Sequence, residues 1–141
     1  MKYIALLIFF IIGGLFLVSR LQTPNQEQTT LSTQTNSEGS VTVEITPEDV
    51  SGPATSWRFK VVLNTHTDEL VSDLTKTVAL KDDKGTVYQP NAWEGTPPGG
   101  HHREGTLFFN PISPRPNKLV LLVRDIGSIT ERSFSWEIGR R

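Results

Sequence analysis

The chain has no cysteine among its 141 residues, so no disulfide stabilises it and no cysteine serves as a nucleophile or as a lipid-modified anchor. An excess of either charge is also missing, because 14 basic residues face 15 acidic ones. A nearly neutral chain offers no electrostatic surface for the phosphate backbone of a nucleic acid. We therefore expect no nucleic-acid partner, and packing alone must stabilise the fold.

Recognisable catalytic motifs are missing as well. No G-x-S-x-G sequence places a serine on a strand-to-helix turn, and no glycine-rich loop leads from a strand into a helix. Carboxylate pairs occur at Glu48 and Asp49 and at Asp82 and Asp83, but both pairs fall in expected turns, where solvated acidic residues are common. We therefore expect a protein that is not an enzyme.

What the chain does contain is a long hydrophobic run near its N-terminus. Residues 3–19 carry no charge and lie between Lys2 and Arg20. The run exceeds the apolar stretch of a secretory signal peptide and ends without a small-residue cleavage site. As a helix it would span roughly 26 Å, close to the thickness of a membrane interior. We expect residues 1–21 to be a signal anchor that forms one transmembrane helix, with a cleaved signal peptide as the alternative.

Polar residues dominate the segment that follows. Residues 22–40 are rich in Thr, Gln, Ser and Asn, and Leu31 is their one aliphatic residue. Such a segment buries too little apolar surface to offset its ordering entropy, which predicts a disordered linker. Residues 41–138 are long enough for one core, and residues 139–141 form a short tail. This layout predicts a single-pass membrane protein with its C-terminal domain outside the cytoplasm.

The apolar residues of the domain recur with a period of two, which is typical of half-buried strands. We expect the first strand to end at Pro47, a tight turn at residues 82–85 with glycine at the left-handed position, and no helix after residue 20. The pattern predicts seven short strands, at residues 41–46, 57–64, 77–80, 86–88, 105–110, 118–125 and 132–138.

Seven short strands in about 100 residues predict an all-β fold, an immunoglobulin-like sandwich of antiparallel strands, with a small barrel as the alternative. Each large side chain that is buried stabilises such a fold by roughly 1.5–3 kcal/mol. The expected core consists of the large apolar side chains at inward positions, namely Trp57, Phe59, Leu107, Phe109, Leu121, Phe134 and Trp136.

The layout resembles a family of small membrane-anchored bacterial cell-envelope proteins that carry one Ig-like domain. The resemblance covers residues 1–138 and depends on the hairpin around residues 82–85, on the strand at 105–110 and on the strand KLVLLVRD at 118–125. It implies an extracytoplasmic binding or structural module with an envelope protein as partner, and it implies no functional residue. The segment at residues 93–105, WEGTPPGGHHREG, departs from the pattern of that family.

This departing segment is the best candidate for a functional site. Its Pro-Pro-Gly-Gly turn presents the adjacent His101 and His102, and His66 follows the strand at 57–64. In a sandwich of this type these loops lie at one end, together with the turn at 125–131. Three imidazoles with a nearby carboxylate suit zinc or copper, so a metal-binding domain that uses His66, His101 and His102 is the alternative function.

Two other interpretations of the same segment stay open. As a polar ligand or protein-contact loop, it would act through Trp93, Arg103 and Glu104. As a purely structural loop, it would have His101 cap a turn, His102 pack on Trp93, and Arg103 pair with an acidic neighbour, which is Glu104, Asp68 or Asp125. The function we expect is that of a membrane-tethered binding or structural module of the cell envelope.

Overall fold

The computed structural model describes residues 31–139. The expected transmembrane helix at residues 1–21 therefore lies outside the described residues, as do residues 22–30 of the expected linker. None of the helices within residues 31–139 has the length and apolar composition needed to cross a membrane.

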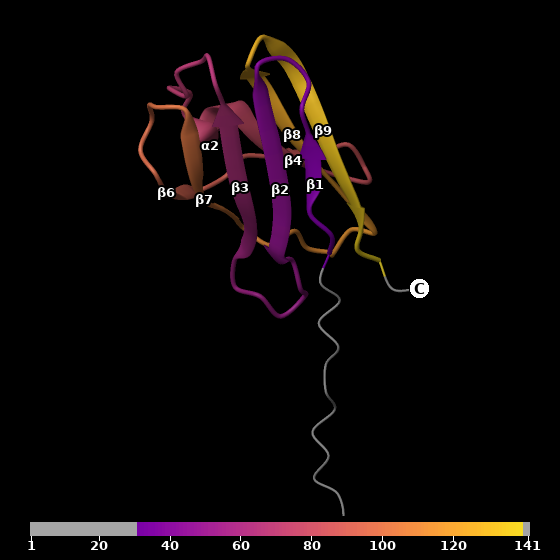
Figure 1. Cartoon of the computed structure of the whole chain (residues 1–141). Helices are drawn as coiled ribbons and strands as arrows, with labels where there is room; N and C mark the ends of the chain where they lie inside the picture. The colour runs from indigo at the N-terminus through magenta and orange to yellow at the C-terminus, as the bar shows by residue number, and fades with distance from the viewer. Residues whose placement is uncertain (1–30, 140–141) are drawn as a thin grey trace, which may run out of the picture.

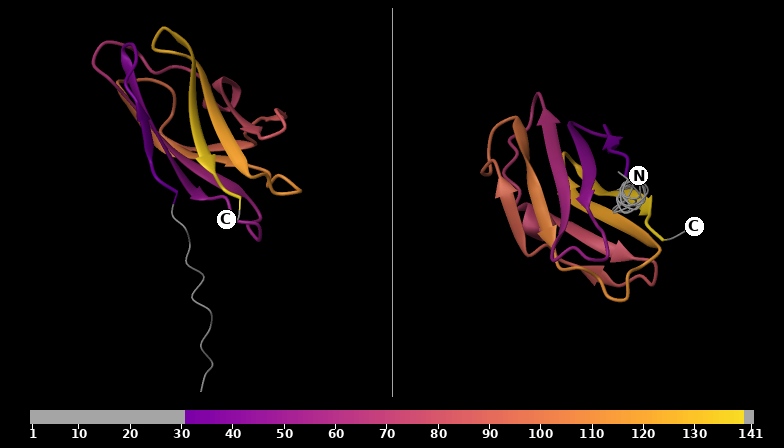
Figure 2. Two further views of the ribbon diagram at one scale, coloured as in Figure 1. Left: turned by 90° about the vertical axis from the view of Figure 1, so that its right-hand side faces the viewer. Right: turned by 90° about the horizontal axis from the view of Figure 1, so that it is seen from below.

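Nine strands in the described part of the chain form two antiparallel sheets that pack as a β-sandwich (Figures 1 and 2). The first sheet has the order β1-β2-β3-β7-β6, with bounds β1 (Gln34–Asn36), β2 (Val41–Asp49), β3 (Trp57–Thr65), β7 (His102–Phe109) and β6 (Ala92–Gly95). The second sheet has the order β5-β4-β8-β9, with bounds β5 (Val87–Tyr88), β4 (Val78–Asp82), β8 (Lys118–Ile126) and β9 (Ile129–Glu137).

The core forms where the sequence places it. Along β2 and β3 every second side chain is buried between the sheets, as the period of two predicts. Phe59 of β3 meets Phe109 of β7 edge to face, with ring centroids 5.6 Å apart, and it meets Trp136 of the other sheet at 5.9 Å. All seven predicted core side chains are buried, namely Trp57, Phe59, Leu107, Phe109, Leu121, Phe134 and Trp136.

The expected linker ends earlier than residue 40, because part of it belongs to the fold. Strand β1 pairs with β2, and the Gln34 side chain exchanges two hydrogen bonds with the backbone of Ser135 on β9. The backbone carbonyl of Ser32 also accepts a hydrogen bond of 2.8 Å from the indole of Trp136. The polar side chains that suggested disorder instead join the edge of one sheet to the edge of the other.

Three further differences concern local structure. Residues Leu74–Thr77 form a one-turn helix, α2, where no helix was expected, and the Asp73 side chain caps it by accepting the N–H of Thr75 at 3.0 Å. Strand β2 continues past Pro47, where the sequence predicts its end, with a shift of register against β3. Strand β1 no longer pairs with β2 at this point, so the N–H that proline lacks costs no hydrogen bond between β1 and β2. Part of the expected loop at residues 93–105 forms β6 and the start of β7.

The two ends of the sandwich differ in what they carry. The described chain begins and ends at one of them, where the N–H of Gly139 donates to Asn117 O at 2.9 Å (Figure 1). We call this the terminal end. The opposite end carries the β1–β2 turn, the crossover segment at residues 66–73, the β6–β7 connection and the β8–β9 turn (Figure 1). We call it the far end.

The turn predicted at residues 82–85 is confirmed. The Asp82 carboxylate accepts hydrogen bonds from the N–H groups of Lys84 (2.9 Å) and Thr86 (2.8 Å) and from the Tyr88 hydroxyl (3.0 Å). Gly85 has φ 86°, a conformation that glycine adopts without strain. Burial raises the pKa of the Asp82 carboxyl, and these hydrogen bonds lower it by more, so that its pKa lies below the ordinary value of 3.8.

Replacing Asp82 with asparagine removes this ionised acceptor, so Asp82→Asn is expected to lower the free energy of unfolding at pH 7. A carboxyl whose pKa folding lowers adds stability above its ordinary pKa and loses that contribution as the pH falls through the folded value. The difference in stability between the two proteins should therefore shrink below about pH 3.8. Urea unfolding from pH 7 down to pH 3 measures it, and a difference that does not change with pH contradicts the assignment.

Candidate functional site

The structure brings the three histidines to the far end but does not converge them. His101 Nδ1 donates to Asp68 O at 2.8 Å, and the backbone carbonyl of His101 accepts from the N–H of Thr65 at 2.9 Å. His102 Nδ1 lies 2.5 Å from Asn64 Oδ1 on the neighbouring strand. All three imidazoles are exposed, and two of them serve local contacts between β3, β7 and the crossover segment.

Within residues 31–139, no group of three or more His, Asp or Glu side chains is placed to share a metal ion. The geometry therefore gives no support to a zinc or copper site at His66, His101 and His102. The expectation that His102 packs on Trp93 is not met either, because the side chain is exposed and contacts Asn64.

Trp93 lies in a hairpin that is built around it. Its indole covers the cross-strand pair Gly95 and Gly105, and a Cβ atom at Gly105 would lie 2.8 Å from the Trp93 ring and 2.6 Å from the Gly95 Cα. The indole N–H donates to Thr96 O at 3.1 Å. Both glycines of this hairpin are thus required by close packing, and Trp93 lies partly buried against the core. Glu104, by contrast, is exposed, with Lys60 at 3.9 Å.

Arg103 is the site residue whose position the sequence interpretation missed. It is 1% exposed and faces inward on β7, where its NH1 donates to Leu70 O at 3.0 Å and to Ser72 O at 2.7 Å. Its guanidinium carbon lies 5.6 Å from the centroid of the Trp93 ring. It forms no ion pair with Glu104, Asp68 or Asp125, contrary to the structural alternative above.

Burial lowers the pKa of the Arg103 guanidinium, and nearby Asp73 partly offsets this, yet an arginine stays charged in proteins. Its Nε is the one buried side-chain polar atom of the described residues that has no hydrogen-bond partner. The positive charge is therefore stabilised by two backbone carbonyls and an aromatic face. In this arrangement Arg103 holds the crossover segment onto the first sheet.

Arg132 is a second buried arginine that connects loops, at the other side of the far end. It is 2% exposed on β9, and its guanidinium donates to Asn36 Oδ1 (2.9 Å), Ile126 O (2.6 Å), Glu38 O (2.6 Å) and Val41 O (3.3 Å). Burial lowers the pKa of this guanidinium as well, with Glu38 raising it. One side chain thus ties the β1–β2 turn to the β8–β9 turn.

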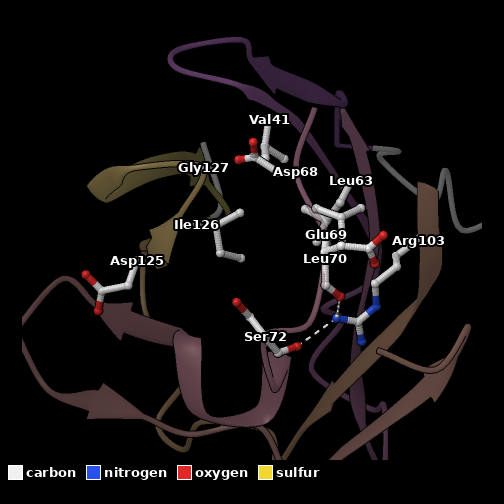
Figure 3. Close-up of a pocket in the computed structure, with 10 residues that line it drawn as sticks. All are labelled: Val41, Leu63, Asp68, Glu69, Leu70, Ser72, Arg103, Asp125, Ile126 and Gly127. Carbon is white, nitrogen blue, oxygen red and sulfur yellow. Dashed lines mark hydrogen bonds between the residues drawn. The ribbon is translucent and has the colours of Figure 1, made fainter. Parts of the chain in front are cut away.

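A pocket of about 130 Å³ opens at the far end, beside Arg103 (Figure 3). Asp68 and Glu69 of the crossover segment and Asp125 at the end of β8 are among its lining residues, but the carboxylates of Glu69 and Asp125 point away from the space between them (Figure 3). The Ser72 hydroxyl points across the cavity towards Ile126 (Figure 3). The loops that the sequence predicted to share one end therefore do so, and they enclose a small pocket.

A second pocket lies at the terminal end, between the β4–β5 turn and residues 112–117, with a volume of about 380 Å³. Its acidic side chains are engaged within the fold, since Asp82 caps the turn and Asp83 accepts the N–H of Asn117 at 2.9 Å. The far-end pocket contains Arg103, whose buried Nε has no hydrogen-bond partner among the described residues, and it is therefore the stronger candidate for binding.

Comparison with known proteins adds no assignment, since no family model, no curated protein and no solved structure matches the chain. The site's function is therefore inferred from its own geometry and from the layout of the chain.

Replacing Arg103 with methionine keeps the unbranched stem of the side chain but removes its hydrogen bonds, so that Ser72 O loses the Arg103 donor and Leu70 O keeps only the N–H of Gly99. Hydrogen bonds to a charged group contribute roughly 1.5–3 kcal/mol each, partly offset by relief of the buried charge, so Arg103→Met should lower the free energy of unfolding by about 2–3 kcal/mol. Arg58→Met is the matched control, because Arg58 is half exposed and its nearest carboxylate, on Asp49, is 4.0 Å away. Urea unfolding measures the free energy of unfolding of both variants, and equally small losses in the two would contradict the role of Arg103.

Proposed function

We propose that the protein is a single-pass, membrane-tethered module whose β-sandwich lies outside the cytoplasm and binds a partner through its far end. The tether is the hydrophobic run at residues 3–19, followed by a polar linker that is shorter than first expected. The proposed role is in binding or envelope structure rather than catalysis.

The observation that carries this proposal is that the start of the described chain and the pocket lie at opposite ends of the sandwich. The described chain begins at the terminal end, whereas the elements that line the pocket lie at the far end (Figure 1). Recognition loops on the side away from the anchor are the ones that a nearby membrane obstructs least. The far end has that location, and two buried arginines hold its turns and its crossover segment in place.

The order of the strands supports an immunoglobulin-like fold. In such sandwiches one sheet has the order A-B-E-D and the other contains C-F-G. Labelling β2, β3, β4, β6, β7, β8 and β9 as A to G gives the same two sheets, with β1 added beside A and β5 added beside C. Loops at one end of these sandwiches are frequent recognition elements, which agrees with a binding role for the far end.

The lack of cysteine allows a direct test of this topology. A single Ser133→Cys change places one thiol at an exposed position of β9, and we expect a membrane-impermeant maleimide to label it in intact spheroplasts of an expressing bacterium. The protein should also stay with the membrane pellet at high salt, because a hydrophobic helix does not dissociate as ionic contacts do.

A Lys2→Cys variant is the matched control, since the proposal places that residue in the cytoplasm, where labelling requires lysis. Labelling of the Ser133→Cys variant only after lysis would place the domain inside and would overturn the proposal. Release of the protein into the soluble fraction would show that no anchor is retained.

A further inference from the structure

We infer that strand β9 is a pairing edge for a second copy of this chain, and that residues 31–36 form a strap that closes this edge until they are released. The strap consists of strand β1 and the three residues before it. It lies beside β9 at the edge of the sandwich (Figure 1). This role is separate from partner binding at the far end.

Gln34 of the strap takes the place of a neighbouring strand beside β9. Its side-chain amide donates to Ser135 O at 2.5 Å and accepts the N–H of Ser135 at 3.1 Å. A residue of an antiparallel strand exchanges the same two hydrogen bonds with the residue opposite. The amide of Gln34 therefore imitates a strand residue and excludes one from pairing with Ser135.

The edge of β9 before Ser135 is open. Strand β9 is the last strand of its sheet, and its residues direct their backbone groups alternately towards β8 and away from it. Since Ser135 directs its N–H and C=O away from β8, Glu131 and Ser133 do so as well. Nothing among residues 31–139 bonds to the backbone of these two exposed residues on that side. Another strand can therefore reach them.

The exposed face of β9 offers little other protection against pairing. Edge strands are commonly kept apart by exposed lysines, by prolines or by bulges. The middle of this face carries serines, and its acidic residues lie towards the ends of the strand. Glu131 is 2.9 Å from Arg124, and Glu137 is 3.8 Å from Lys118, so both acidic charges are balanced by β8. Gln34 is thus the contact that blocks the middle of the edge.

The strap buries little apolar surface. None of the side chains at residues 31–36 is fully buried, and Leu31 packs only partly against the core. Besides Gln34, the strap offers β9 two hydrogen-bond acceptors, Ser32 O for an indole and Asn36 Oδ1 for a guanidinium. Segments with so little buried surface open at low cost in free energy. Release of the strap is therefore a local event that leaves the two-sheet core in place.

A second copy of β9 fits the open edge because this edge is complementary to itself. Two antiparallel β9 strands related by a two-fold axis at Ser133 place Ser133 opposite Ser133, and Glu131 opposite Ser135 of the other copy. No two acidic residues then face each other, whereas like charges directly opposite would destabilise the pair. Because this register uses the backbone of Ser135, it forms only after Gln34 has left.

The test introduces one thiol into the full chain in detergent, since the chain has no cysteine of its own. Opposite residues of such a pair have Cα atoms about 5.5 Å apart, within the range of a disulfide. Under mild oxidation, Ser133→Cys chains should form a linked dimer about tenfold faster with Gln34→Ala than without it, because both hydrogen bonds to Ser135 are lost. Thr35→Ala is the matched control on β1 and should leave the rate unchanged, since its exposed side chain forms no hydrogen bond with β9 within the described chain.

Lys60→Cys, at an exposed position of the central strand β3, controls for unfolding and for association that does not involve β9. A mixture of Glu131→Cys and Ser135→Cys chains, both with Gln34→Ala, should link position 131 to position 135 faster than either position to itself. An unchanged rate at position 133 would overturn the inference. Equal acceleration at position 60, or faster linking of positions 131 and 135 each to itself, would overturn it as well.

Discussion

Hydrogen bonds from two inward-facing arginines to backbone carbonyls hold the far end of the sandwich together. Arg132 joins the β1–β2 turn to the β8–β9 turn, and Arg103 fixes the crossover between the two sheets. Neither uses a carboxylate partner, so both buried charges depend on carbonyls, an amide and, for Arg103, the face of Trp93. These hydrogen bonds connect the loops at one end of a chain that has no disulfide. The pocket between those loops depends on them.

The same arrangement keeps an arginine charge inside the fold. Had Arg103 paired with Asp68 or Asp125 instead, the crossover segment would have lost the donor that binds Leu70 O and Ser72 O. The guanidinium keeps its positive charge in the pocket wall while it binds those carbonyls, so Arg103 both shapes the site and lowers its negative potential. The position of the tether at the opposite end then leaves this surface facing away from the proposed membrane.

The sequence was sufficient for the two-sheet architecture because large apolar residues alternate so regularly, and every predicted core side chain is buried. The same alternation also indicates two inward-facing arginines. Arg132 lies an even number of residues before Phe134 and Trp136 and so on their face of β9, and Arg103 stands in the same relation to Leu107 and Phe109 on β7. Inward arginines were therefore recognisable. The role of Gln34 was not, because its side chain pairs with the backbone of Ser135, far away in sequence, and only the folded chain brings the two together. The three histidines share one end of the sandwich, as the sequence predicts, but the described residues place no group of three ligands around one metal position.

The most direct test of the account compares the two exposed valines, one at each end of the domain. A photo-crosslinking amino acid is placed at Val71 or at Val87 in the full-length protein in native membranes. The account predicts a discrete crosslinked product from position 71 and none from position 87. Crosslinking from position 87 alone, or equally from both, would contradict the claim that the far end is the recognition surface.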